Sequence, residues 1–325
     1  MTIDPKEAQR IVAIYDALHH PFDCTERLRS DPPLLAHYTS VETAEKIIKK
    51  EEIWLSHPFY MNDLEELRFG MLQGIQSFAS FAEAAVSPNR RQELINHFNF
   101  FIEHMNEETL VNTYVLCLSE HSPDDKDGVL SMWRSYASQG HGVAIVFNTR
   151  RIPDPAQAPL RIAKVIYGSA NDRIKLLTSG LVEWVRITKA LDLPDNQLHL
   201  AAYGAFLFIK NFALMTKHWG FSEEAEWRII YVPEVDPEGR LAKQLTYHIS
   251  SRGAETKLKF KIAPVLGGPP DSLSLATLVE FILLGPSISS PIAQAAFRRV
   301  LKDTCLKDFE DRVFASTIPL RPTVG

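Results

Sequence analysis

The 325-residue sequence has little cysteine. Cys24, Cys117 and Cys305 lie far apart, and no Cys-x-x-Cys pair occurs. An odd number of widely spaced cysteines argues against a disulfide framework and against a structural zinc site. Cys117 lies in the apolar run Tyr-Val-Leu-Cys-Leu, so we expect it in the hydrophobic core.

Three further features are missing. Neither common glycine-rich phosphate loop is present, so the usual signatures of nucleotide binding are absent. The N-terminus lacks a charged-then-apolar signal pattern, and no apolar run approaches the length of a membrane span. The formal net charge of -5 argues weakly against a broad basic face for nucleic acid. These absences predict a soluble cytoplasmic protein without a membrane partner.

What is present is a large apolar fraction, 45% of the residues, arranged in periodic segments. We expect helices at 5–18, 41–50, 63–105 with a break at Pro88, 129–138, 170–190, 197–216 and 290–303. We expect strands at 34–40, 53–55, 113–118, 142–147, 161–167, 224–232, 244–249, 257–263, 278–284 and 312–318. Dispersed strands between helices of unequal length predict an α+β fold with a mixed or antiparallel sheet.

The domain organisation follows from the same pattern. We expect one α+β domain over 1–325, with a helical extension at 1–33 and helical insertions at 63–105 and 170–216. Ser40 is expected to cap the helix that begins at residue 41. Asn62 or Asp63 is expected to cap the helix that follows them, with Glu65 or Glu66 as a capping-box partner.

Two motifs hold polar residues beside apolar segments. His37, Tyr38 and Thr39 end the first expected strand. Glu224 and Glu226 precede Arg228 in another, and alternation is expected to place all three on one face. Two carboxylates on one strand face repel each other unless something compensates them, which favours a functional site. The alternative is a surface ion-pair ladder in which Arg228 balances the glutamates.

The order of several motifs resembles a family. His37-Tyr38-Thr39, Asn62-Asp63-x-x-Glu66, Ser131-Met132-Trp133-x-x-Tyr136, Gly142 and Glu224-x-Glu226-Trp227-Arg228 are similar to the bacterial domain of unknown function 2971. The resemblance extends over about residues 34–318. The family commonly has proline after Asn-Asp, where this chain has Leu64. The family name carries no activity.

A more distant resemblance is to ADP-ribosyltransferases, which implies split sheets, NAD as co-substrate and no metal. In that superfamily a histidine of the first strand holds NAD and a glutamate of a late strand is catalytic. His37 and Glu226 match these two residues. The resemblance implies a toxin or phage-defence effector whose acceptor is a protein, a nucleic acid or a small molecule. The implied catalytic residues are Glu226 and Glu224, and the implied NAD-binding residues are His37, Tyr38, Thr39, Asn62, Tyr136 and Arg228.

Two other classes stay open. Asp63, Glu66, Glu224 and Glu226 could hold a divalent cation in a nuclease or phosphoesterase. A non-catalytic sensing or binding protein could keep the same fold. We predict that His37, Tyr38, Tyr136 and Glu226 converge on one cleft, because their motifs hold the polar and aromatic residues least explained by packing. A cleft with His37 and Glu226 within reach of one ligand would favour the transferase.

Overall fold

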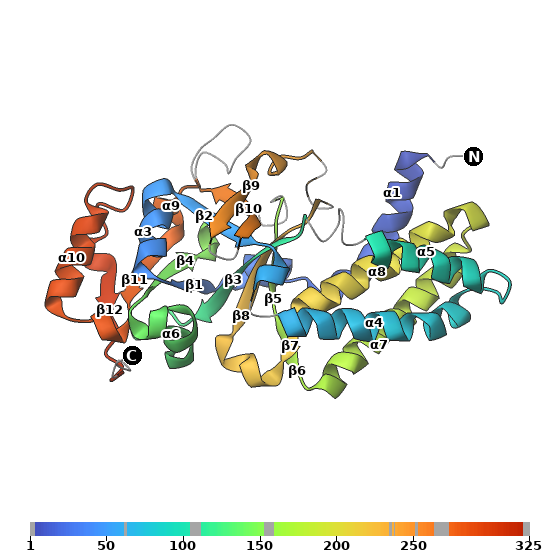
Figure 1. Ribbon diagram of the computed structural model, residues 1–325, viewed down its shortest axis with the longest axis horizontal. Helices are drawn as coiled ribbons and strands as arrows, with labels where there is room; N and C mark the ends of the chain where they lie inside the picture. Colours follow the sequence, from blue (N-terminus) through green and yellow to red (C-terminus); the bar gives the residue numbers. More distant parts are fainter. Residues whose placement is uncertain are drawn as a thin grey trace. The chain divides into compact units, whose positions relative to one another are not determined.

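A computed structural model describes residues 4–61, 64–104, 112–152, 159–233, 236, 238–250, 253–262 and 273–320 (Figure 1). It confirms an α+β fold. The chain separates into two compact units. The sheet unit comprises Cys24–His57, Tyr114–Lys164 and Ser222–Gly325, and the helical unit comprises Met1–Asp23, Pro58–Thr113 and Val165–Phe221. The helical segments expected as an extension and two insertions therefore largely make up a compact unit of their own.

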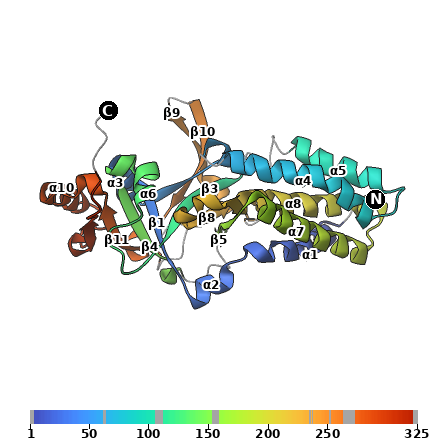
Figure 2. The same ribbon diagram turned by 90° about the horizontal axis from the view of Figure 1, so that it is seen from below.

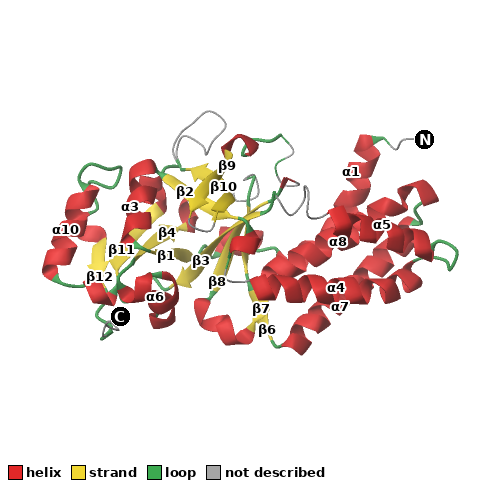
Figure 3. Cartoon of the chain, viewed as in Figure 1, coloured by secondary structure: helices red, strands yellow, loops and turns green. Residues whose placement is uncertain are grey.

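The sheet unit contains a sheet in which ten described strands take part (Figure 3). Its main path runs β12-β11-β4-β1-β3-β2-β10-β9, and β8 pairs with both β3 and β5. All pairings are antiparallel except that of β11 with β12. The strands are β1 Leu34–Thr39, β2 Glu52–Ser56, β3 Tyr114–His121, β4 Val143–Asn148, β5 Arg161–Lys164, β8 Glu226–Tyr231, β9 Leu245–Ser250, β10 Gly253–Lys261, β11 Val279–Leu284 and β12 Val313–Ala315.

Strand β3 is where the sheet divides. One edge of β3 pairs with β1 through the register Ala36–Ser119 and then with β2 at Ser56–Val115. The other edge of β3 pairs with the whole of β8, from Tyr114–Tyr231 to Ser119–Glu226. Cys117 therefore lies on β3 between the end of its pairing with β1 and the start of its pairing with β2.

The two faces of this sheet have separate cores. The α3 face carries Leu35 and Leu118 and packs with α3 (Val41–Lys50), α9 (Leu275–Leu278) and α10 (Pro291–Leu301). The α6 face carries Ala36 and Tyr38 and packs with α6 (Leu130–Tyr136). Because successive side chains of a strand point to opposite faces, the register assigns every residue of β1, β3, β5 and β8 to one face or the other.

In the helical unit, four long helices lie side by side (Figure 2). They are α4 Leu64–Ala85, α5 Arg91–His104, α7 Ala170–Leu191 and α8 Leu198–Met215, joined by α1 Pro5–Ile14 and by a parallel pair of short strands, β6 Ile166–Gly168 and β7 Thr216–His218. The segment Asp195–Met215 is long and apolar enough to span a membrane, contrary to the expectation from sequence. Its apolar window is 78% buried, which is consistent with the core helix of a soluble protein.

Several local predictions are confirmed. The Ser40 hydroxyl accepts the Thr43 N–H at 3.1 Å and caps α3. The region expected to be helical over 63–105 breaks between α4 and α5, around Pro88. The capping residues Asn62 and Asp63 lie outside the described residues, so their roles stay predictions.

Two predicted elements are wrong in detail. The helix expected at 5–18 ends at Ile14 and continues as the 3-10 helix Tyr15–Phe22, which contains Pro21. Proline lacks the N–H of an α-helix interior, which disfavours an α-helix there. The strand expected at 161–167 is two strands in different sheets, β5 and β6, separated at Val165.

Candidate functional site

The first strand residue of β8, Glu226, forms a two-point ion pair with Arg228. Arg228 Nε donates to Glu226 Oε1 at 2.7 Å, and Nη2 donates to Oε2 at 3.2 Å. The two residues are only 3% and 4% exposed. Residues i and i+2 of a strand share a face, which brings the two side chains together. The pair is neutral as a whole, so each charge is compensated although both are taken out of water.

A serine on the neighbouring strand lies beside this pair. Ser119 of β3 is in register with Glu226, so both side chains lie on the α6 face. Ser119 is 1% exposed, and its Oγ has no hydrogen-bond partner among the residues that the structure describes. A buried hydroxyl without a partner is unfavourable and calls for an explanation, such as a water or ligand group.

Ser119 was not among the residues expected from the sequence. The local sequence Leu118-Ser119-Glu120-His121 reads as the polar end of a strand, and nothing in it indicates β8 as the neighbour. A signal was available in the alternation of β3. Val115, Cys117, Ser119 and His121 share one face, which becomes more polar toward the strand end.

Glu224 does not share the strand with Glu226, so the prediction that alternation aligns them is wrong. Strand β8 begins at Glu226, and the preceding Ala225 has a φ of 42°, in the left-handed region. That backbone conformation interrupts the alternation before it reaches Glu224. Glu224 is instead held by α6, because the Tyr136 hydroxyl donates to its Oε1 at 2.8 Å. The structure thus does bring together Tyr136 and Glu224, although not through strand alternation.

His37 lies on the opposite face of the sheet from Glu226, so the predicted convergence of these two residues is wrong. Ala36 is in register with Ser119, and Ser119 with Glu226, which puts Ala36 on the α6 face and His37 on the α3 face. His37 Nδ1 lies 3.4 Å from the carbonyl oxygen of Cys117, where the sheet divides. Burial lowers the pKa of His37, and the bond to Cys117 opposes that shift. His37 thus contacts a backbone carbonyl of β3 at the point where the sheet divides.

Tyr38 shares the α6 face but belongs to the core. Its ring packs edge-on against Trp133 at 4.8 Å, and its hydroxyl accepts the Val129 N–H at 3.0 Å. Burial raises the pKa of Tyr38 to about 12. Thr39 alternates to the α3 face and is 8% exposed. The contacts of Tyr38 are those of a packed core residue.

The four carboxylates of the nuclease hypothesis are not seen as a set. Asp63 lies outside the described residues. Glu66 belongs to the helical unit, where it pairs with Arg173, a guanidinium only 4% exposed. Glu66 and Glu226 are thus each bound to a buried arginine, and a metal would have to displace these arginines. Within the described part of the chain, no group of three or more metal-binding side chains comes together.

Comparison with known proteins gives one similarity. The model of a family described as a protein of unknown function (DUF2971) matches residues 132–229. The matched segment includes Tyr136, Glu224, Glu226 and Arg228 and excludes His37 and Ser119. No curated protein and no solved structure matches the chain. Over this segment the chain is therefore similar to a family whose description assigns no activity.

Proposed function

We propose that the sheet unit is an NAD-dependent ADP-ribosyltransferase-like enzyme in which Glu226 stabilises the transition state. The observation that carries this proposal is the buried pair of Glu226 and Arg228 beside the hydroxyl of Ser119, which has no hydrogen-bond partner among the described residues. A buried ion pair next to a hydroxyl without a hydrogen-bond partner lowers the stability of the folded state. It is useful where a substrate hydroxyl and a developing positive charge have to be bound.

The chemistry assigns one task to each carboxylate. When the bond from ribose to nicotinamide breaks, nicotinamide leaves with the bonding electron pair, and the ribose carbon becomes oxocarbenium-like. Glu226 stabilises that positive charge and accepts a hydrogen bond from a ribose hydroxyl. The acceptor then forms a bond to the same carbon, and Glu224 takes up the proton that the acceptor loses. Tyr136 orients Glu224 through its 2.8 Å hydrogen bond.

The distribution of NAD contacts differs from the one expected from sequence. His37 and Thr39 lie on the α3 face, opposite Glu226, so neither side chain belongs to the proposed NAD site. Ser119, which is in register with Glu226, would hydrogen-bond a ribose hydroxyl of NAD instead. Arg228 keeps the carboxylate of Glu226 compensated and oriented. The acceptor of the ADP-ribose group stays open among protein, nucleic acid, small molecule and water.

The direct test is nicotinamide release from NAD by the wild type and by Ser119→Ala. The Ser119 hydroxyl has no hydrogen-bond partner in the described part of the chain, so removing it should leave the unfolding midpoint unchanged. Losing one hydrogen bond to the substrate should slow release about 2- to 10-fold. Ser135→Ala is the matched control, because Ser135 is an exposed serine of α6. Equal release by Ser119→Ala and the wild type would remove Ser119 from the site.

NAD binding gives an independent readout. A ligand at about 100 times its dissociation constant should raise the free energy of unfolding by about 2.7 kcal/mol. The wild type should show this stabilisation by NAD, and Ser135→Ala should match it. The proposal would be contradicted if NAD did not stabilise the wild type and if the wild type did not consume NAD with any acceptor offered.

A further inference from the structure

A charged pocket of about 620 Å³ lies at the end of the sheet where β3, β4 and β5 finish and β8 begins. Its lining residues belong to the sheet unit alone. They include three cations, Arg27, Lys164 and Arg150, and the carboxylates Asp31, Glu120 and Glu280. The volume is typical of a site for a small molecule. Glu120 and Lys164 lie on the α3 face, away from Glu226.

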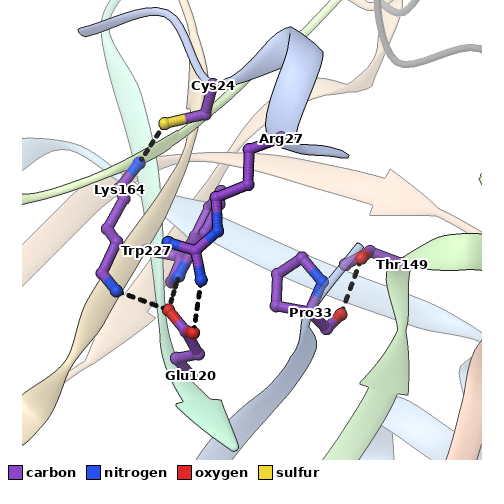
Figure 4. A network of polar contacts seen from close by, with 7 residues as sticks. All are labelled: Cys24, Arg27, Pro33, Glu120, Thr149, Lys164 and Trp227. Atoms are coloured by element: carbon purple, nitrogen blue, oxygen red, sulfur yellow. Dashed lines mark hydrogen bonds and ion pairs between the residues drawn. The ribbon is translucent and has the colours of Figure 1, made fainter. Parts of the chain in front are cut away.

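The wall of the pocket is built on Glu120, which three donors share (Figure 4). Arg27 Nη2 donates to Glu120 Oε1 at 2.5 Å, and Lys164 Nζ donates to Oε2 at 2.6 Å. Trp227 Nε1 donates to the same Oε2 at 2.9 Å, and the Arg27 guanidinium lies 5.1 Å from the centre of the Trp227 ring. Both carboxylate oxygens are thus occupied by donors from three different elements.

This arrangement leaves a surplus of positive charge. Arg27 and Lys164 carry two positive charges, and Glu120 supplies one negative charge between them. Burial alone would raise the pKa of Glu120, but the hydrogen bonds of Lys164 and Trp227 and the charges of Lys164 and Arg27 lower it below its usual value. The side chains of Arg27 and Lys164 are 36% and 34% exposed, so their remaining N–H groups are accessible from the pocket.

Arg150 adds a third cation. It is exposed and, within the described ranges, forms no ion pair. The preceding residue, Thr149, donates its hydroxyl to the Pro33 carbonyl at 2.6 Å, which fixes this turn beside the start of β1 (Figure 4). Glu280 does not neutralise Arg150, because its Oε2 already accepts from Arg151 and from Asn148. Asp31 is the lining carboxylate that opposes the cations from an exposed position.

We propose that this pocket binds a phosphate-bearing small molecule, whose phosphate oxygens accept from Arg150, Lys164 and Arg27. Because Glu280 is paired with Arg151, the cations Arg27, Lys164 and Arg150 exceed the remaining lining carboxylates, Glu120 and Asp31, by one charge. This surplus and the free N–H donors favour an anionic ligand that is rich in acceptors. A small molecule fits a pocket of about 620 Å³. A nucleic acid fits less well, because the chain has a formal net charge of -5. The assignment does not depend on NAD turnover.

Calorimetric titration of the full-length protein with inorganic pyrophosphate tests the proposal. The wild type should bind saturably, and Arg150→Ala should bind about tenfold more weakly, because one charge-assisted contact is lost. Arg299→Ala is the matched control, since Arg299 is an exposed arginine of α10 outside the pocket. Absence of saturable binding by the wild type, or equal binding by Arg150→Ala and the wild type, overturns the proposal.

Two further titrations sharpen the assignment. Asp31→Asn should bind pyrophosphate more tightly, because it removes the opposing charge, and weaker binding would count against this site. A 5′-phosphorylated single-stranded oligonucleotide should bind no more tightly than pyrophosphate, and tighter binding would overturn the small-molecule assignment. Pyrophosphate binding is measured without NAD, and nicotinamide release is measured without pyrophosphate, so failure of this proposal is distinguishable from failure of the NAD proposal.

Discussion

Glu226 and Glu120 lie on opposite faces of one sheet. Both carboxylates are removed from water to some degree, and their negative charges are compensated in different ways. Glu226 has a side chain only 4% exposed and forms a two-point ion pair with Arg228 on its own strand. Glu120 has a side chain 26% exposed and accepts hydrogen bonds from two cations and an indole N–H, which come from separate elements. The charges of Glu226 and Arg228 cancel in a buried pair, whereas Glu120 lies between two partly exposed cations that leave one surplus positive charge.

The difference separates two kinds of site. A sealed, neutral pair depends on each partner, because removing one leaves an uncompensated charge in a poorly solvated place. An open cluster with surplus charge tolerates changes, because water and ions reach its members. This contrast is the reason why we propose Glu226 as the transition-state carboxylate and the cluster around Glu120 as the binding site for an exchangeable anion.

The largest effect should come from Arg228→Met. The variant leaves Glu226 buried without its guanidinium, and breaking a buried pair in this way costs about 3–5 kcal/mol of unfolding free energy. Urea unfolding measures the loss. A cost similar to that of a surface ion pair would show that water reaches Glu226, and the contrast with Glu120 would disappear.

The double variant Glu226→Leu with Arg228→Met should recover most of that loss. Replacing a whole buried ion pair by apolar side chains of similar size is often neutral or stabilising by about 1–4 kcal/mol. The same urea titration tests this recovery. A double variant as unstable as Arg228→Met alone would mean that packing, and not an unpaired charge, causes the instability.

A smaller effect is expected from Glu120→Gln, about 1–2 kcal/mol, because charge-assisted bonds are lost at a partly exposed site. The loss should depend on pH. The pKa of Glu120 is lowered in the folded protein, so its contribution is complete above the usual value of 4.5 and disappears as the pH falls through the lowered folded value. The stability difference between the wild type and Glu120→Gln should therefore be larger at pH 7 than below pH 4.5. A difference that grows on acidification would contradict the network.

The smallest effect should come from Ser40→Ala, which provides an uncharged reference on the α3 face. Losing the hydroxyl that caps α3 should cost about 1 kcal/mol. Val41→Ala is a control one residue away that leaves the cap in place. If Ser40→Ala destabilised the protein as much as Arg228→Met, the ranking of sealed pair, open cluster and cap would be wrong.

Much of the fold could be predicted from the sequence, because local signals specify it. Pro88 predicted the break between α4 and α5, and Ser40 predicted the start of α3. These signals act over a few residues through backbone conformation and capping. The grouping of distant helices into one unit depends on tertiary packing instead, which local periodicity does not encode.

The site was predicted only in part. The pairing of Glu226 with Arg228 follows from residues two apart on a strand, and the sequence indicated it. The opposite orientation of His37 depends on the register between β1, β3 and β8. Register is a property of strand partners that lie some 80 and 190 residues away along the chain. Ser119 and the cluster of Glu120 with Arg27 and Lys164 were missed for the same reason.

The most direct test of the central claim is NAD turnover by the double variant Glu226→Leu with Arg228→Met, measured on a sample whose unfolding midpoint has been determined. If Glu226 stabilises the transition state, the variant should be folded and as stable as the wild type within about 1 kcal/mol. It should release nicotinamide at least about 100–1000-fold more slowly. A stable double variant that consumes NAD at the wild-type rate would contradict the assignment and leave the pair with a structural role alone.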